Sequence, residues 1–206
     1  MEQSNDIKVL KGLEAIRQRP AMYMGSLDNV LIPNILLREA LCCARDDALQ
    51  GKCQALSISF ESDGRATVDD DGPGLPLDLG PCGKRKVETY LTSLYACAGG
   101  KSSEEIARTT CTLGLAVLNA LSSELTVRIF ADGNEWMQCY REGNPVTELA
   151  VVGNSARRGT ELSFKLDAKL LPLREFQLDE FKGWVKENVK ELAVNILDLR
   201  TNAFER

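Results

Sequence analysis

The sequence of 206 residues contains no histidine, and this absence removes several kinds of chemistry. A histidine triad, a histidine general base and a phosphohistidine carrier all require an imidazole ring. The sequence also has no CxxC pair, so together these two absences argue against a zinc site.

Long apolar runs are also missing, and so are targeting features. No stretch of 18 apolar residues predicts a membrane span, and the first residues lack the basic and apolar regions of a signal peptide. The seven cysteines are odd in number and scattered. We expect them to be reduced thiols that pack as small hydrophobic side chains, in a cytoplasmic protein with no membrane association.

Charge and composition indicate an ordinary globular chain that does not bind nucleic acid by itself. Apolar residues make up 44% and charged residues 27%, and 25 basic against 30 acidic side chains give a net charge of −5. A domain that binds a nucleic-acid backbone is usually basic. We expect one domain over residues 1–206, with an amino-terminal arm at 1–25, and DNA contacts only through other parts of a larger assembly.

Hydrophobic periodicity predicts helices mainly early in the chain and strands mainly late. Helices are expected at 33–50, 84–98, 113–121 and 173–194. Strands are expected at 56–60, 66–68, 125–130, 136–140, 148–152, 160–166 and near 196–199, with turns at Asp63-Gly64, Asp132-Gly133 and 143–145. This order predicts an α+β fold, a two-layer sandwich of helices on a mixed, mainly antiparallel sheet.

An acidic, glycine-rich box, Asp69-Asp70-Asp71-Gly72-Pro73-Gly74-Leu75-Pro76, directly follows a predicted strand. A carboxylate at a strand end can accept a hydrogen bond from an exocyclic amine, and nearby glycines allow a ring or a phosphate to approach the backbone. Taken alone, the same residues also suit a plain surface turn.

The box stands in an ordered series of motifs that resembles one family. The series comprises the opening segment 7–25, Glu39 on a helix, the acidic box, Ala98-Gly99-Gly100-Lys101, Leu118-Asn119-Ala120-Leu121-Ser122 and Gly159-Thr160 before a strand. In order and spacing it resembles the amino-terminal ATPase domain of gyrase B and topoisomerase IV B subunits, within the GHKL superfamily. The resemblance covers nearly the whole chain and implies the GHKL (Bergerat) ATP-binding fold.

The resemblance implies a role for each matching position. Asp70 would hold the adenine amino group, Gly74 would shape the base pocket, and Thr160 would support both. Glu39 would activate the attacking water, and Lys101 and Gly114 would lie near the phosphates. The full set of expected nucleotide contacts is Ala40, Cys43, Val68, Asp70, Gly72, Gly74, Leu75, Lys101, Gly114, Leu115 and Thr160.

Each of these positions also has a simpler interpretation. Glu39 could be a solvated helix carboxylate, Lys101 a surface lysine, and Gly114 a site of close helix packing. Val68 and Leu75 would be core residues with or without a ligand.

The sequence departs from the family pattern mainly where phosphate and metal would bind. The family has asparagine as a Mg²⁺ ligand at position 43, where this chain has Cys43, and Cys42 replaces an aspartate. Ile35 stands in place of a histidine that orients the glutamate. The glycine-rich lid of the family reads Arg108-Thr109-Thr110-Cys111-Thr112-Leu113-Gly114 here. Sulfur is a poor ligand for magnesium, so ATP is the expected cofactor and Mg²⁺ is doubtful.

Two functional hypotheses follow, and a third fits less well. The chain could be the ATPase module of a type II topoisomerase, which would couple ATP to DNA strand passage as a homodimer with a gyrase A-like subunit. It could instead be a degenerate nucleotide-binding or protein-interaction module that hydrolyses little or no ATP, in line with the substitution of Pro73 for an arginine of the family. A sensor kinase or chaperone of the same superfamily is less compatible with the opening segment. In the family a following domain supplies a further lysine to the γ-phosphate, and the sequence ends at Arg206 before such a domain.

Overall fold

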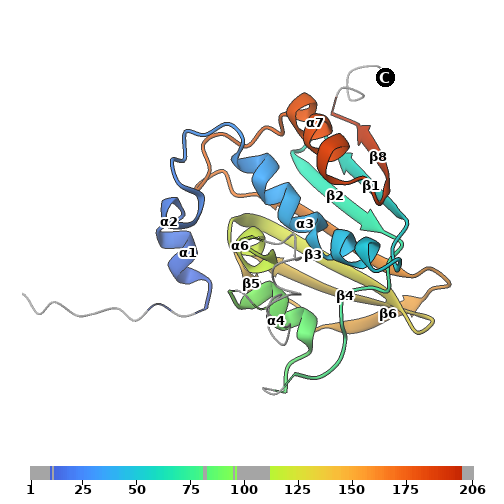
Figure 1. Ribbon diagram of the computed structural model, residues 1–206. Helices are drawn as coiled ribbons and strands as arrows, with labels where there is room; N and C mark the ends of the chain where they lie inside the picture. The colour runs from blue at the N-terminus through green and yellow to red at the C-terminus, as the bar shows by residue number, and fades with distance from the viewer. Residues whose placement is uncertain (1–9, 11, 81–82, 95, 97–111, 201–206) are drawn as a thin grey trace, which may run out of the picture.

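A computed structural model describes residue 10 and residues 12–80, 83–94, 96 and 112–200 of the chain. Its strands form one eight-stranded sheet in the order β5-β4-β3-β7-β2-β1-β8, with β6 paired to β4 (Figure 1). The bounds are β1 (Ala55–Phe60), β2 (Arg65–Asp70), β3 (Ser122–Ala131), β4 (Asn134–Arg141), β5 (Asn144–Pro145), β6 (Ala150–Asn154), β7 (Gly159–Leu166) and β8 (Ala193–Asp198). The β1–β8 pair is parallel and the other pairs are antiparallel.

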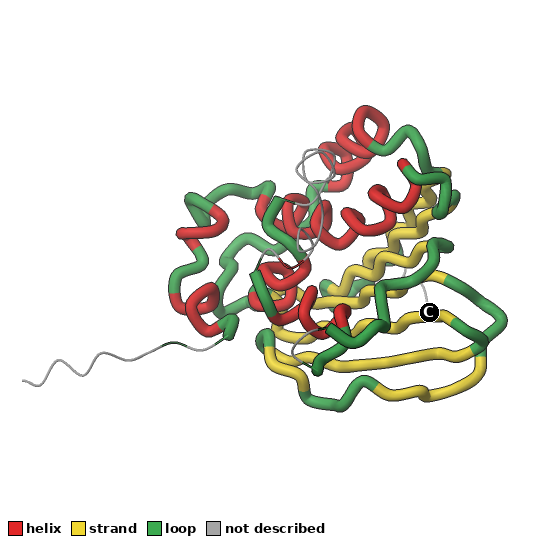
Figure 2. Tube along the Cα trace, turned by 60° about the horizontal axis from the view of Figure 1, so that its bottom comes forward, coloured by secondary structure: helices red, strands yellow, loops and turns green. Residues whose placement is uncertain are grey.

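The helices lie together on one side of this sheet (Figure 2). They are α1 (Glu14–Gln18), α2 (Ala21–Met24), α3 (Ile32–Leu49), α4 (Lys86–Thr92), α6 (Leu115–Ala120) and α7 (Leu178–Asn188). Residues along β1 and β7 alternate between buried and partly exposed, so one sheet face meets the helices and the other meets solvent. The predicted α+β sandwich with a mixed, mainly antiparallel sheet is confirmed.

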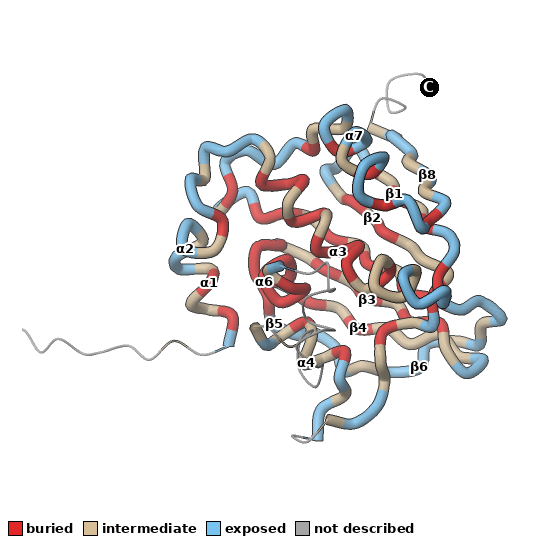
Figure 3. The backbone as a smooth tube through the Cα atoms, in the orientation of Figure 1, coloured by how far each residue is buried: buried red, intermediate tan, exposed pale blue. Residues whose placement is uncertain are grey.

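Helix α3 runs along the centre of the helical layer and is largely buried (Figure 3). Pro33 lies in its first turn, where a missing N–H leaves no hydrogen bond unmade. Leu36, Leu37 and Leu41 recur with helical period and are fully buried against the sheet and α6. Burying three leucines contributes roughly 5–9 kcal/mol before the entropy of ordering is subtracted. Glu39 enters the interior of the protein on the same helix.

Two hairpin turns test the predicted turn positions. Asp132 and Gly133 both have positive φ, 54° and 76°, as a two-residue hairpin turn requires, so this predicted turn is confirmed. The turn predicted at 143–145 is displaced by one residue, because Glu142 and Gly143 take the positive φ values instead. Residues 144 and 145 then pair with β4 as the short strand β5.

Two predicted helices are shorter in the structure than in the prediction over 84–98 and 173–194. Helix α4 ends at Thr92 because Ser93 has an extended backbone, and residues 95, 97 and 98 of the predicted range lie outside the described residues. Helix α7 begins only at Leu178. Buried Asn34 on α3 donates to the carbonyl of Gln177 at 2.9 Å and accepts its N–H at 3.0 Å. This pair of bonds fixes residue 177 outside the helix, which local periodicity does not indicate.

The described part of segment 1–25 packs against the rest of the chain. Ile16 is buried in the common core, and Arg17 donates to the carbonyl of Ala120 at 2.7 Å and to Asp167 at 2.6 Å. A separate arm at 1–25 and a single domain over 1–206 stay predictions. None of the helices that the structure describes combines the length and apolar character needed to cross a membrane.

Candidate functional site

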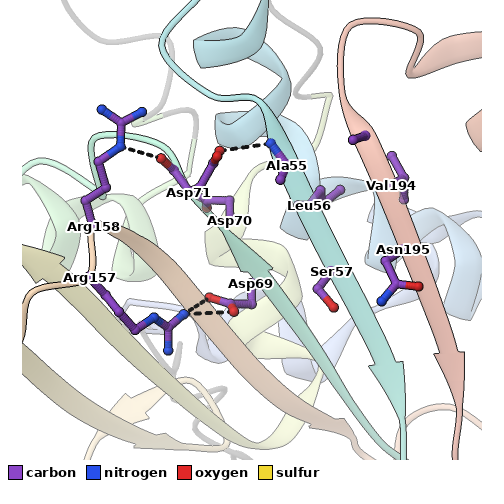
Figure 4. Close-up of a pocket in the computed structure, with 11 residues that line it drawn as sticks. Ala55, Leu56, Ser57, Asp69, Asp70, Asp71, Arg157, Arg158, Val194 and Asn195 are labelled. Atoms are coloured by element: carbon purple, nitrogen blue, oxygen red, sulfur yellow. Dashed lines mark hydrogen bonds and ion pairs between the residues drawn. The ribbon is translucent and has the colours of Figure 1, made fainter.

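The three consecutive aspartates at the end of β2 point in different directions (Figure 4). Strand alternation sends Asp69 to the outer sheet face, where Arg157 donates to both carboxylate oxygens at 2.6 and 2.8 Å. Asp71 accepts the backbone N–H of Ala55 at 2.9 Å and so fixes the start of β1. Asp70 remains as the carboxylate directed to the helical face.

Asp70 is an ionisable group held in a half-buried position. Its Oδ1 accepts the N–H groups of Gly72 at 2.8 Å and Thr160 at 3.3 Å. Its Oδ2 makes no hydrogen bond with any residue that the structure describes. Burial raises the pKa of Asp70 to about 6, the two N–H donors oppose this rise, and the nearby carboxylates of Asp47 and Asp69 add to it. The result is an oriented carboxylate with one oxygen available to a donor.

Gly159 brings the start of β7 against the backbone of Asp70. Its φ is 122°, and a Cβ at this position would lie 1.8 Å from the Asp70 carbonyl oxygen. This close approach places Thr160 beside the carboxylate. The Thr160 hydroxyl oxygen accepts the N–H of Leu75 at 2.9 Å, so its own proton is available for another acceptor.

Apolar side chains adjoin this polar group. Val68, Leu75 and Ala40 are all buried in the common core. Gly74 has a φ of 85°, and a Cβ there would lie 3.0 Å from Ile129 Cγ2 and 3.2 Å from a backbone oxygen. The base pocket that the sequence predicts at these residues stays a prediction, because their burial is equally that of core residues.

Glu39 forms a second polar cluster, at the start of α6. Its side chain is buried, and Oε2 accepts the N–H groups of Gly114 at 2.8 Å, Leu113 at 3.1 Å and Thr112 at 3.2 Å. The Thr112 hydroxyl donates to Oε1. The carboxylate therefore accepts hydrogen bonds from the backbone N–H groups that precede α6, and it lies at the end of the helix dipole that favours negative charge.

This arrangement does not match a solvated helix carboxylate, the simpler interpretation of Glu39. It also differs from the expected role in activating water. A general base must come within hydrogen-bond distance of the proton that it removes, and five donors of the chain, the Cys42 thiol among them, already surround this carboxylate. Gly114, predicted to lie near phosphate, donates to Glu39, and the neighbouring Leu115 is fully buried.

The residues near the predicted metal position do not fit Mg²⁺. Cys43 is half-buried and presents sulfur one turn after Glu39, whereas magnesium prefers oxygen ligands. Ile35, one turn before Glu39, packs against the core. Among the described residues no group of three or more histidine, cysteine, aspartate or glutamate side chains could hold a metal ion. Lys101 lies outside the described residues.

Sequence reasoning missed several residues that shape these two clusters. The sequence indicates Thr112 only as a poor substitute for a lid glycine, yet it supplies two donors to Glu39. Arg157, between β6 and β7, donates to Asp69, and Asp71, within the box, accepts the backbone N–H of Ala55 at the start of β1. The run of three aspartates was the available signal, because alternation along a strand predicts that neighbours face opposite sides.

No protein-family model matches the chain. Individual proteins do match it. It is 37% identical to the DNA gyrase B subunit of Thermotoga maritima over 188 residues, which is 89% of this chain and 29% of that protein. It is 37% identical to the type 2 topoisomerase B subunit of Aquifex aeolicus, over 91% of this chain and 23% of that protein. It is 34% identical to the DNA topoisomerase 4 B subunit of Staphylococcus epidermidis, over 96% of this chain and 30% of that protein.

The chain thus spans less than a third of the length of these relatives. The alignment with these relatives covers about nine-tenths of this chain, and the chain has the fold that the resemblance implies. The chain is therefore a divergent homologue of part of the gyrase B and topoisomerase IV B subunits, consistent with their amino-terminal domain.

Proposed function

We propose that the chain is the ATP-binding domain of a type II topoisomerase B-like protein, and that it binds an adenine nucleotide with little or no hydrolysis. The observation that carries this proposal is the half-buried Asp70 carboxylate, which Gly72 and Thr160 orient and whose Oδ2 makes no hydrogen bond with the residues that the structure describes. A carboxylate of this kind recognises a base through its exocyclic amine.

The residues around Asp70 fit the base half of a nucleotide. Oδ2 can accept the adenine amino group, and the Thr160 hydroxyl can donate to a ring nitrogen. A Cβ on Gly72 would lie 2.8 Å from Asp70 Oδ1, so glycine leaves the approach to the carboxylate open. Val68 and Leu75 supply the apolar surroundings in which a planar base is stable.

The phosphate half fits less well. The N–H groups of residues 112–114 are bonded to Glu39, and Cys43 offers sulfur where Mg²⁺ requires oxygen. ATP would supply a phosphoanhydride bond for cleavage. Loss of one electrostatic donor in a catalytic site commonly costs about 10²–10³ in rate, which supports binding with slow turnover.

A role in DNA strand passage depends on parts beyond this chain. We propose that nucleotide binding couples to strand passage through a homodimer and a gyrase A-like subunit, with DNA held by other domains. The net charge of −5 supports the last point. The capture of Glu39 by its own chain favours the second candidate, a nucleotide-binding module that acts through protein contacts. Sedimentation with and without ATP tests dimer formation.

The binding proposal is tested by calorimetry with ADP and GDP on the same chain. Guanine presents a carbonyl oxygen where adenine presents an amine, so the Asp70 carboxylate repels it. We expect ADP to bind at one site and GDP to bind at least about 10-fold more weakly, the loss of one hydrogen bond to a charged group. Equal affinities, or no binding of ADP, would exclude adenine recognition at Asp70.

A further inference from the structure

The Glu39 carboxylate connects two elements that are distant in sequence. It lies on α3, and its donors precede α6, 73–75 residues later. The two helices lie side by side on the same face of the sheet (Figure 1). Three consecutive backbone N–H groups and one hydroxyl converge on this single anion.

We propose that Glu39 is a built-in anion that takes the place of the nucleotide phosphates, so that the preferred ligand of the site is an adenine nucleoside. This inference rests on the proposed function, since it assumes that adenine binds at Asp70. It assigns Glu39 the role of a positioning residue that holds the start of α6 closed. The phosphate chain of ATP would then add little to the affinity.

The physical reason is competition for the same donors. A phosphate that approaches the N–H groups of residues 112–114 must displace the carboxylate, and the displaced charge then has to be solvated or paired elsewhere. Two anions at one set of donors repel each other, because the interior screens charge poorly. An uncharged nucleoside meets none of these costs.

Neutralising Glu39 should reverse the preference. In Glu39→Gln the side chain keeps its shape but loses its charge, and its amide nitrogen is a donor facing other donors. The N–H groups are then available to phosphate. The matched control is Glu187→Gln, because Glu187 is exposed on α7 and lies outside the site.

Calorimetry with adenosine and ATP tests the inference on the full chain. For the wild type we expect the two dissociation constants to agree within about 3-fold, which is less than 1 kcal/mol. In Glu39→Gln we expect ATP to bind about 10-fold more tightly, with adenosine unchanged, which corresponds to one charge-assisted hydrogen bond. Thr112→Val, which removes only the hydroxyl donor, should shift the ratio in the same direction by a smaller factor.

The outcomes separate this inference from the proposed function. If the wild type binds ATP about 100-fold more tightly than adenosine, the inference is wrong and the proposed function stands. An unchanged ratio in a folded Glu39→Gln protein also overturns it. If neither ligand binds the wild type, the proposed function fails and the inference fails with it. The wild-type ratio decides the matter even if the variants do not fold.

Discussion

Replacing Asp70 by asparagine should stabilise the fold while it weakens adenine binding. Burial, the largest influence, raises the pKa of Asp70 from 3.8 to about 6. A difference of about 2 pKa units corresponds to roughly 3 kcal/mol of cost for holding the charge in the folded chain at neutral pH. Asparagine keeps an oxygen for the N–H groups of Gly72 and Thr160 and carries no charge. We expect Asp70→Asn to raise the free energy of unfolding by about 1–3 kcal/mol at pH 7.5.

The pH dependence of this difference has a defined sign. Between about pH 4 and pH 6 the folded chain holds a proton on Asp70 that the unfolded chain has released. The free energy of unfolding of the wild type therefore falls as pH rises through this range and stays low above it. The advantage of Asp70→Asn should thus be full at pH 7.5 and vanish near pH 4, where both side chains are neutral.

The binding effect of the same substitution is opposite in direction. Asparagine that accepts the two N–H groups points its own amide donor at the position of Oδ2, where the adenine amine is also a donor. The loss of a hydrogen bond to a charged acceptor, about 1.5–3 kcal/mol, weakens affinity for an adenine nucleoside roughly 10- to 150-fold. Urea denaturation at several pH values and calorimetry with adenosine measure the two effects. A variant that is less stable at pH 7.5, or that binds adenosine as tightly as the wild type, would refute the reasoning.

Two further substitutions test how the site is held in place. Gly159→Ala places a Cβ against a backbone oxygen of β2 and should lower the free energy of unfolding by about 3 kcal/mol or more, measured by thermal or urea denaturation. Gly133→Ala is the control, because Gly133 has a positive φ of 76° but open space, and it should cost about 1 kcal/mol. Equal losses would contradict the close-approach argument. Arg17→Gln leaves the buried Asp167 carboxylate unpaired and should cost about 3 kcal/mol at pH 7. Burial raises the pKa of Asp167, but the hydrogen bond from Arg17 outweighs this effect and holds that pKa below its usual value. The stability that the Arg17–Asp167 pair contributes is therefore lost as pH falls. The free energies of unfolding of the variant and the wild type should converge below about pH 4 in the same denaturation assay.

Local patterns in the sequence account for most elements of the fold. The period of the leucines predicted α3, and alternation predicted the β1–β2 hairpin, because both signals arise from side chains that face one core. The start of α7 was wrong because Asn34, more than 140 residues earlier, binds residue 177. Nothing near residue 173 in the sequence contains that information.

The two halves of the candidate site also differ in how far the sequence predicted them. Asp70, Gly72 and Thr160 meet as their motifs predicted, because adjacent strands β2 and β7 carry them to one place. The donors of Glu39 were not predicted, since the contact joins α3 to residues 73–75 positions away. Spacing alone identifies a carboxylate and cannot reveal that its own chain will bind it.

The central claim is that this chain retains adenine recognition and has lost hydrolysis. The most direct measurement is to incubate the wild-type chain with excess ATP and Mg²⁺ and to quantify bound nucleotide and released phosphate in the same sample, with Glu39→Ala as the comparison. The account predicts binding at one site, with phosphate release by the wild type equal to that of Glu39→Ala and to the protein-free background. Brisk phosphate release by the wild type that Glu39→Ala abolishes would contradict it.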